Sequence, residues 1–116
     1  MFTKPNTGAQ PTFRSNFPAA DTAAVITVDA DADHIHVLHW IHAGFDLAPL
    51  AAAKLNVTIN AVEVWAVDIP ANLANAGPHE FQFPDGLFGS NKNEAMVITL
   101  ATGGAGKTGK INAKTT

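Results

Sequence analysis

The chain has 116 residues, a formal net charge of −3 and no cysteine. This length fits one domain with one hydrophobic core, and the lack of cysteine excludes thiol catalysis, cysteine-ligated zinc and iron–sulfur clusters. Ten acidic against seven basic residues leave no basic stripe for phosphate contacts, which argues against direct nucleic-acid binding. With 15% charged and 47% hydrophobic residues, we expect a surface covered by other subunits or by a larger shell.

The sequence gives no sign of a membrane protein. No segment has the ~20 consecutive apolar residues that span a bilayer, and the first eight residues lack the charged-then-apolar pattern of a cleaved leader. We therefore expect a soluble protein that is not exported by a leader. The absence of cysteine fits assembly in a reducing cytoplasm.

Residues 1–22 are rich in Pro, Asn, Thr and Ala, with three phenylalanines in no regular spacing. Such a composition predicts an extended N-terminal arm, held either by a partner chain or by its own domain. Part of residues 11–17 would add a strand if it pairs. Residues 23–116 are expected to form the domain itself.

The domain alternates β-branched runs with turn residues and has no long helical period. The only helical candidate, Leu47–Lys54, is interrupted by Pro49 and allows one turn at most. This pattern predicts an all-β fold, an antiparallel β-sandwich (jelly-roll-like) of seven to eight strands with an extended N-terminal arm. The seven expected strands are Ala24–Asp29, His34–Phe45, Lys54–Asn60, Val62–Ile69, His79–Phe83, Glu94–Ala101 and Thr108–Ala113.

Strict alternation assigns inward faces to several of these strands. It places Phe81 and Phe83 together, and Asn60-Ala61 is the expected hairpin turn between two strands. The apolar positions expected to share a face within their strands are Leu55, Val57 and Ile59, and Met96, Ile98 and Leu100.

The two tryptophans receive different predictions. Alternation puts Leu38 and Trp40 on one face and Ile35, Val37 and Ile41 on the other, so the strand is expected to be covered on both sides. We therefore expect Trp40 in the core. Trp65 falls on the face of Glu63 and Val67, which makes it the candidate surface aromatic for stacking on a sugar.

Ala101–Thr108 (ATGGAGKT) satisfies a relaxed phosphate-loop pattern. A phosphate loop requires a helix after the glycines, and the residues after Thr108 have poor helix propensity. The stretch is therefore expected to be a turn between the last two strands.

Four histidines, His34, His36, His39 and His42, lie within nine residues. His34 and His36 could share a metal on one strand face, with a third ligand drawn from His79, Glu80 or Glu63, but the glutamate of a cupin His-x-His motif is absent. The favoured interpretation is histidines facing solvent or a subunit contact, with His39 hydrogen-bonded at the core edge. At such a contact they would make assembly sensitive to mild acid.

Asp29, Asp31 and Asp33 are typical of a turn, or of a weak calcium loop without an EF-hand's glycine and distal glutamate. No catalytic set is apparent. We assign no catalytic, cofactor-binding or metal-binding residues, expect no cofactor, and do not expect an enzyme.

Residues 24 to about 113 resemble small β-sandwich structural proteins of tailed bacteriophages and prophages, most clearly in the stretch from Gly89 through Asn112 (GSNKNEAMVITLATGGAGKTGKIN). The shared pattern is Asn93-Glu94-Ala95, an alternating strand, a glycine-rich turn and a short final strand. The Lys54–Ile59 strand and the Ala76-Gly77-Pro78 turn are similar as well. The histidine-rich strand and the arm are not part of this pattern.

The resemblance implies a role in the virion. The expected function is a capsid decoration (cement) protein that binds the major capsid protein on the outside of a phage head, as a homotrimer. The alternative is a carbohydrate-binding or structural domain of a tail fibre or spike, with a surface glycan as partner. A cupin-like metal enzyme is the third hypothesis.

Overall fold

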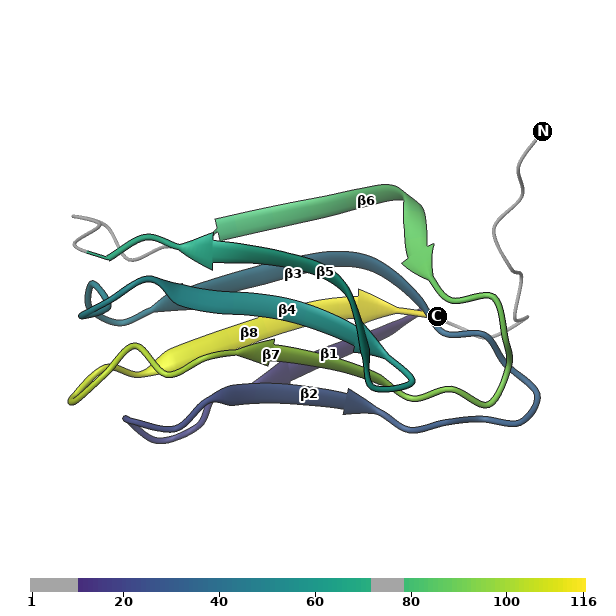
Figure 1. Cartoon of the computed structure of the whole chain (residues 1–116), viewed down its shortest axis with the longest axis horizontal. Helices are drawn as coiled ribbons and strands as arrows, with labels where there is room; N and C mark the ends of the chain where they lie inside the picture. Colours follow the sequence, from purple (N-terminus) through teal and green to yellow (C-terminus); the bar gives the residue numbers. More distant parts are fainter. Residues whose placement is uncertain (1–10, 72–78) are drawn as a thin grey trace.

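The structure, a computed structural model, describes residues 11–71 and 79–116. This part of the chain forms eight β-strands, which run along the long axis of the molecule in two antiparallel sheets (Figure 1). No helix among these residues has the length and apolar character needed to cross a membrane. The strands are β1 (Thr12–Asn16), β2 (Ala24–Val28), β3 (Val37–Phe45), β4 (Ala53–Ile59), β5 (Val62–Ile69), β6 (His79–Phe88), β7 (Met96–Leu100) and β8 (Gly109–Thr115).

The strand order identifies the sandwich as a jelly roll. The first sheet has the order β1-β8-β3-β6 and the second β2-β7-β4-β5, so the chain changes sheet between consecutive strands everywhere except at β4 and β5. Eight antiparallel strands exchanged in this way between two sheets are the two Greek keys of a jelly roll. The predicted antiparallel β-sandwich is confirmed.

An aliphatic core fills the space between the sheets. The predicted inward triplets of β4 and β7 are all buried, and Ile41 and Ile111 meet them from the first sheet. Phe81 and Phe83 pack against this core on one side of β6, as alternation predicted. Burial of this continuous apolar surface is the main stabilising term for a domain of this size.

Three segments differ from their predicted form. The Leu47–Lys54 segment forms no helical turn, because β4 begins at Ala53 and the residues before it form a loop. β3 begins at Val37, so His34 and His36 lie in the preceding loop. β6 continues to Phe88, past the predicted turn, through an irregularity that contains Gly86 at φ 79°.

The described part of the predicted arm is a strand. β1 pairs antiparallel with β8, from Thr12 opposite Thr115 to Asn16 opposite Ile111. The Nε of Arg14 donates a 2.9 Å hydrogen bond to the Oγ1 of Thr115, which is buried. This is the eighth strand that the sequence left open, and residues 1–10 lie outside the described residues.

A β-bulge in β3 reverses the predicted position of Trp40. Leu38 pairs with Thr115 and Trp40 with Lys114, so His39 is an extra residue on β3. One extra residue exchanges the two faces of a strand beyond it. Leu38 and Ile41 therefore both face the core, and Trp40 lies on the outer face. The prediction that Leu38 and Trp40 share a face was wrong for this reason.

A second bulge, in β5, reverses Trp65. Trp65 pairs with Val57 and Glu63 with Thr58, which leaves Val64 as the extra residue. Glu63 points outward, where it forms an ion pair with Lys54 and accepts a 3.0 Å hydrogen bond from Asn56. Trp65 instead packs against the core. Both tryptophans thus lie on the face opposite to the one predicted.

The β4–β5 hairpin turns at the predicted Asn60-Ala61 pair. Both residues have positive φ, 51° and 64°, as a two-residue turn of this hand requires. Asparagine tolerates this conformation, whereas alanine is strained in it because of its Cβ. Ala61 is therefore a strained position in an otherwise regular hairpin.

Replacing Ala61 by glycine should raise the free energy of unfolding by about 1 kcal/mol, which corresponds to roughly 4 °C in a thermal melt followed by circular dichroism. Gly106→Ala is the matched control, because Gly106 has a φ of 74° and open space where a Cβ would lie. It should lower stability by a similar amount. A neutral or destabilising Ala61→Gly change would contradict the assigned turn geometry.

Candidate functional site

The outer face of the first sheet carries the aromatic side chains that the described strands turn outward. Phe13 of β1, Lys114 of β8, Trp40 of β3 and Gln82 of β6 are paired in register and therefore lie side by side across all four strands. The outer face of the second sheet is built from small, aliphatic and charged side chains such as Thr99 and Lys54. The two faces of the sandwich are chemically different.

Phe13, Trp40 and His42 form a continuous line of rings, called here the aromatic row. The ring centroids of Phe13 and Trp40 are 6.1 Å apart, and those of Trp40 and His42 are 4.4 Å apart. Phe13 is 71% exposed, and the Nζ of Lys114 lies 6.0 Å from its ring centroid. Side chains at such distances support one another, so the rings present a defined surface.

Polar groups border the aromatic row. The Nε2 of His42 lies 3.7 Å from the Oε1 of Glu80, directly opposite on β6. The side-chain amide of Gln82 donates to the same carboxylate oxygen of Glu80. This edge of the row therefore offers both hydrogen-bond donors and an acceptor to solvent.

Trp65, the candidate surface aromatic of the sequence analysis, is partly buried against the core. Its ring meets Phe81 and Phe83 edge-to-face, with centroids 5.2 Å and 5.3 Å apart. These contacts close the open side of the sandwich between β5 and β6, where the two edge strands lie opposite each other. Trp65 thus packs against the core on this side of the sandwich.

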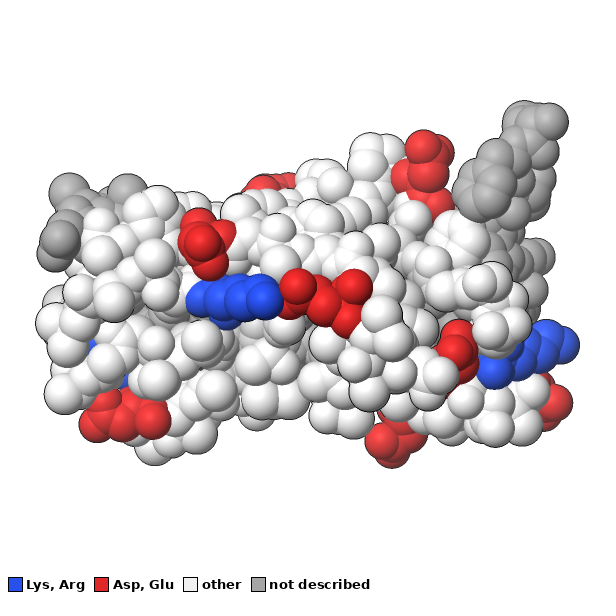
Figure 2. Space-filling view, viewed as in Figure 1, with Lys and Arg blue, Asp and Glu red and all other residues white. Residues whose placement is uncertain are grey.

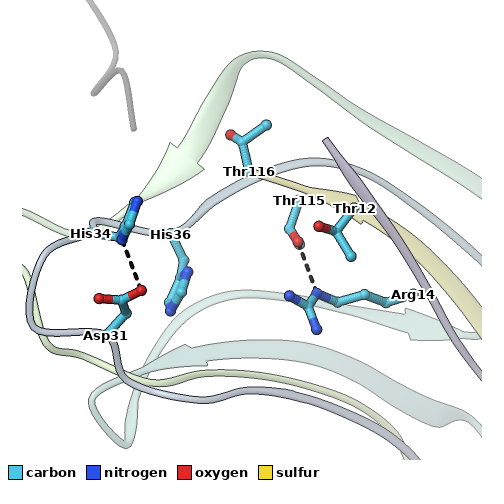
Figure 3. Close-up of a pocket in the computed structure, with 7 residues that line it drawn as sticks. All are labelled: Thr12, Arg14, Asp31, His34, His36, Thr115 and Thr116. Atoms are coloured by element: carbon cyan, nitrogen blue, oxygen red, sulfur yellow. Dashed lines mark hydrogen bonds and ion pairs between the residues drawn. The ribbon is translucent and has the colours of Figure 1, made fainter. Parts of the chain in front are cut away.

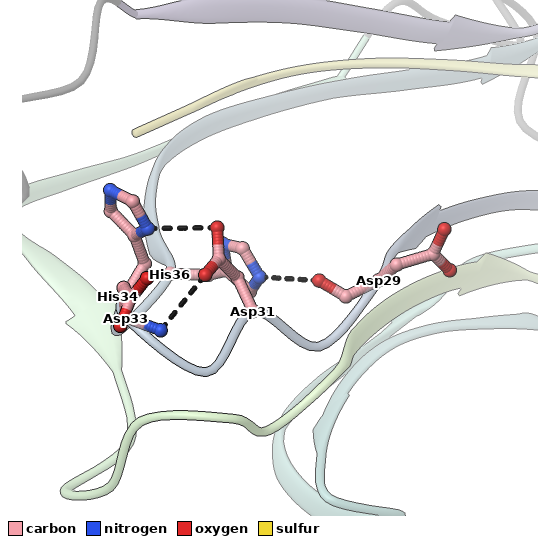
Figure 4. Close-up of polar contacts among 5 residues, drawn as sticks. All are labelled: Asp29, Asp31, Asp33, His34 and His36. Carbon is pink, nitrogen blue, oxygen red and sulfur yellow. Dashed lines mark hydrogen bonds and ion pairs between the residues drawn. The ribbon is translucent and has the colours of Figure 1, made fainter.

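His34 and His36 organise the loop of residues 29–36, called here the histidine loop (Figure 4). The Nδ1 of His34 lies 2.8 Å from the Oδ2 of Asp31, and His36 Nε2 lies 2.7 Å from the main-chain oxygen of Asp29. The other carboxylate oxygen of Asp31 accepts a hydrogen bond from the N–H of Asp33. That hydrogen bond, followed by the contact with His34, lowers the pKa of Asp31. These side chains hold the loop in shape.

A small pocket of about 160 Å³ lies between the histidine loop and the ends of β1 and β8 (Figure 3). Asp31, His34 and His36 line one side, and Arg14 and Thr115 line the other. Because Arg14 and Asp31 carry opposite charges, the pocket offers no single-sign field for a charged ligand.

The candidate metal ligands do not converge. His42 and Glu80 lie on the outer face of the first sheet, whereas Glu63 lies on the outer face of the second. His39, in the bulge, has its Nε2 3.0 Å from the Oγ1 of Thr116, and the Nε2 of His79 is buried. Within residues 11–71 and 79–116, no three His, Asp or Glu side chains are close enough together to hold a metal ion.

The phosphate-loop look-alike, Ala101–Thr108, joins two antiparallel strands, β7 and β8, with no helix after it. It belongs to the three-loop end, defined here as the loops 17–23, 46–52 and 101–108 at one end of the sandwich (Figure 1). Asp21 accepts a hydrogen bond from the N–H of Gly106, and Asp46 accepts one from the N–H of Thr108. Two of the main-chain N–H groups that a phosphate would need therefore already donate hydrogen bonds to carboxylates of neighbouring loops.

Further main-chain hydrogen bonds fix the three-loop end. The N–H of Leu50 donates to the carbonyl of Gly103, and the N–H of Asp21 donates to that of Lys107. Gly104, at φ 103°, lies directly against the side chain of Leu50, where a Cβ would collide with it. The loops are therefore mutually braced. Even so, Leu47 and Leu50 are 55% and 62% exposed.

Sequence reasoning missed two of these features. Phe13 and Arg14 were assigned to an arm, and only their positions opposite Lys114 and Ala113 in β8 reveal a role. The sequence allows Leu47–Lys54 at most one helical turn because of Pro49, but it does not predict that Leu47 and Leu50 are exposed.

Compared with models of known protein families and with curated proteins, the sequence matches none of them.

The two tryptophans should differ in their contribution to stability. Trp65→Ala should lower the free energy of unfolding by about 3 kcal/mol, because it empties the side closed by Phe81 and Phe83. Trp40→Ala, on the outer face, should cost less than about 1 kcal/mol. Urea unfolding of both variants measures the difference. A larger loss for Trp40→Ala would contradict the two bulges.

Asp31→Asn should weaken the protein at neutral pH but not in acid. The pKa of Asp31 is lower in the folded chain, so its carboxylate stabilises the fold above its unfolded-state pKa. That contribution is lost as the pH falls through the folded-state value, below about pH 4.

The urea midpoint of Asp31→Asn should therefore lie below that of the wild type at pH 7, and the gap should close in acid. Asp33→Asn is the control, because Asp33 contributes its main-chain N–H rather than its carboxylate. A gap that is the same at both pH values would disprove the role of the Asp31 charge.

Proposed function

We propose that this chain is a structural protein of a bacteriophage particle, a decoration protein that binds the major capsid protein on the outside of the head as a homotrimer. It acts there without a catalytic site or cofactor and reinforces the joints between capsid subunits. Its place is the virion, assembled in the host cytoplasm.

The observation that carries this proposal is the three-loop end. It is braced by main-chain hydrogen bonds and yet exposes Leu47 and Leu50 to solvent. Apolar side chains held on a rigid frame lose little conformational entropy on binding, which favours a permanent protein contact. The major capsid protein is the proposed partner of this end.

The low charge of the surface supports the proposal that other proteins cover this chain in the particle. Figure 2 shows one face of the molecule on which uncharged atoms predominate and the charged side chains are scattered. Only 15% of the residues are charged. A surface low in charge can be covered by a shell without leaving unpaired charges in the interface.

The fold supports the same proposal by analogy. Jelly rolls occur in viral capsid proteins, as well as in lectins and cupins. The stretch that resembles phage structural proteins, Gly89 through Asn112, contains β7 and most of β8, and these are interior strands of the two sheets. The resemblance therefore includes two interior strands of the framework together with the loop 101–108 that joins them.

The rival hypotheses gain less support. A cupin-like metal enzyme binds its metal among inward side chains. Here the buried core cluster is made of apolar side chains, and His34 and His36 hold a loop. A fibre domain that stacks a sugar on Trp65 is also less supported, because the Trp65 ring packs against Phe81 and Phe83.

Leu47→Asp should abolish binding to the head while leaving the domain folded, since Leu47 is exposed and a carboxylate cannot be buried in the contact without cost. The measurement is cosedimentation of the purified protein with undecorated heads of the phage that encodes it. Val62→Asp is the matched control, because Val62 is 63% exposed next to the hairpin turn, at the other end of the sandwich.

Val62→Asp should occupy the heads as the wild type does. If Leu47→Asp also decorates at full occupancy, the three-loop end is not the contact. If the wild-type chain itself fails to sediment with heads, the decoration proposal is wrong.

A further inference from the structure

We propose that the outer face of the first sheet is a binding site for a neutral oligosaccharide, which stacks on the aromatic row of Phe13, Trp40 and His42. This inference goes beyond the proposed role in the particle. It rests on the exposed residues of β1, β3, β6 and β8 and does not involve the three-loop end.

The row has the shape that a sugar requires. A pyranose ring has flat faces of C–H groups and an edge of hydroxyls, so it packs on an aromatic ring while its hydroxyls reach polar neighbours. Phe13 and Trp40 lie on strands separated by β8, yet their ring centroids are only 6.1 Å apart. The His42 ring lies 4.4 Å from that of Trp40, so the three rings form one continuous strip on which a sugar can pack.

Polar side chains border the rings where the hydroxyls would lie. Glu80 and Gln82 lie on β6, opposite His42 and Trp40, and Lys114 and Asn112 lie beside the same two residues on β8. This set contains donors and acceptors on both sides of Trp40. A hydroxyl, which both donates and accepts, can pair with each of these groups.

The charges of this face select a neutral ligand. On the strands of this face, Lys110 and Lys114 of β8 are opposed by Glu80 of β6. Two lysines and one glutamate are far from the basic stripe that a nucleic acid or an anionic polymer needs, and they give no negative field for a cation. The chain as a whole is acidic. The ligand class that remains is a hexose or N-acetylhexosamine oligosaccharide.

The face is too polar for a second copy of the chain. A stable protein interface has an apolar centre from which charged residues are depleted. Around Phe13 and the partly exposed Trp40, the neighbouring outward side chains of β6 and β8 are polar, namely Glu80, Gln82, Asn112 and Lys114. A sugar needs only such a narrow apolar strip.

The test is binding of the isolated full chain to an array of neutral hexose and N-acetylhexosamine oligosaccharides, followed by titration of the best binder. The wild type should bind at least one member. Trp40→Ala and Phe13→Ala should each weaken that binding by about tenfold or more. Phe17→Ala is the matched control, since Phe17 is 62% exposed and follows β1, outside the aromatic row.

Phe17→Ala should keep wild-type affinity, and thermal melts of all three variants should report a folded domain. The proposal is overturned if no oligosaccharide binds, or if Trp40→Ala binds as the wild type does. It is also overturned if the wild type is a dimer that Trp40→Ala dissociates, because a second copy would then occupy the face. No phage head enters this experiment, so its outcome is separate from that of the decoration test.

Discussion

Two single-residue bulges, in β3 and β5, determine which aromatic side chains of this jelly roll are exposed to solvent and which are buried. Side chains on a strand alternate with a period of two, so one extra residue exchanges core and solvent positions beyond it. His39 does this in β3, where it brings Leu38 into the core and turns Trp40 outward. Val64 does it in β5, where it turns Trp65 inward against Phe81 and Phe83. The closed side of the sandwich and its exposed aromatic face are both consequences of these two positions.

The general fold was predictable because it depends on patterns that repeat. The alternation in β4 and β7 and the turn pair Asn60-Ala61 predict strands, faces and a hairpin that the structure confirms. The histidine loop was not predictable in the same way. A His-x-His pair resembles a metal motif on a strand. In the structure, however, His34 is hydrogen-bonded to the carboxylate of Asp31 and His36 to the carbonyl of Asp29, in the loop before the strand begins. The two bulges could not be predicted from the sequence pattern, because any residue type can occupy the extra position of a bulge.

The three-loop end and the outer face of the first sheet differ in their chemistry. The three-loop end gains rigidity from Asp21 and Asp46, whose carboxylates bind the N–H groups of Gly106 and Thr108. These hydrogen bonds hold the loops in place although the side chains of Leu47 and Leu50 are exposed and contribute little packing. The outer face of the first sheet is separate from that end and instead combines aromatic rings with polar side chains. A particle protein with both features would hold the shell with one surface and meet an external glycan with another.

The most direct test of this account is the solvent accessibility of each tryptophan by itself. Trp65→Phe leaves Trp40 as the only indole, and Trp40→Phe leaves Trp65, because the chain contains two tryptophans. Acrylamide quenching of fluorescence then reports each ring separately. Trp40, on the outer face, should be quenched strongly and emit at longer wavelength, whereas Trp65, packed against the core, should be quenched weakly and emit at shorter wavelength. The reverse order would contradict both bulges, and with them the aromatic face.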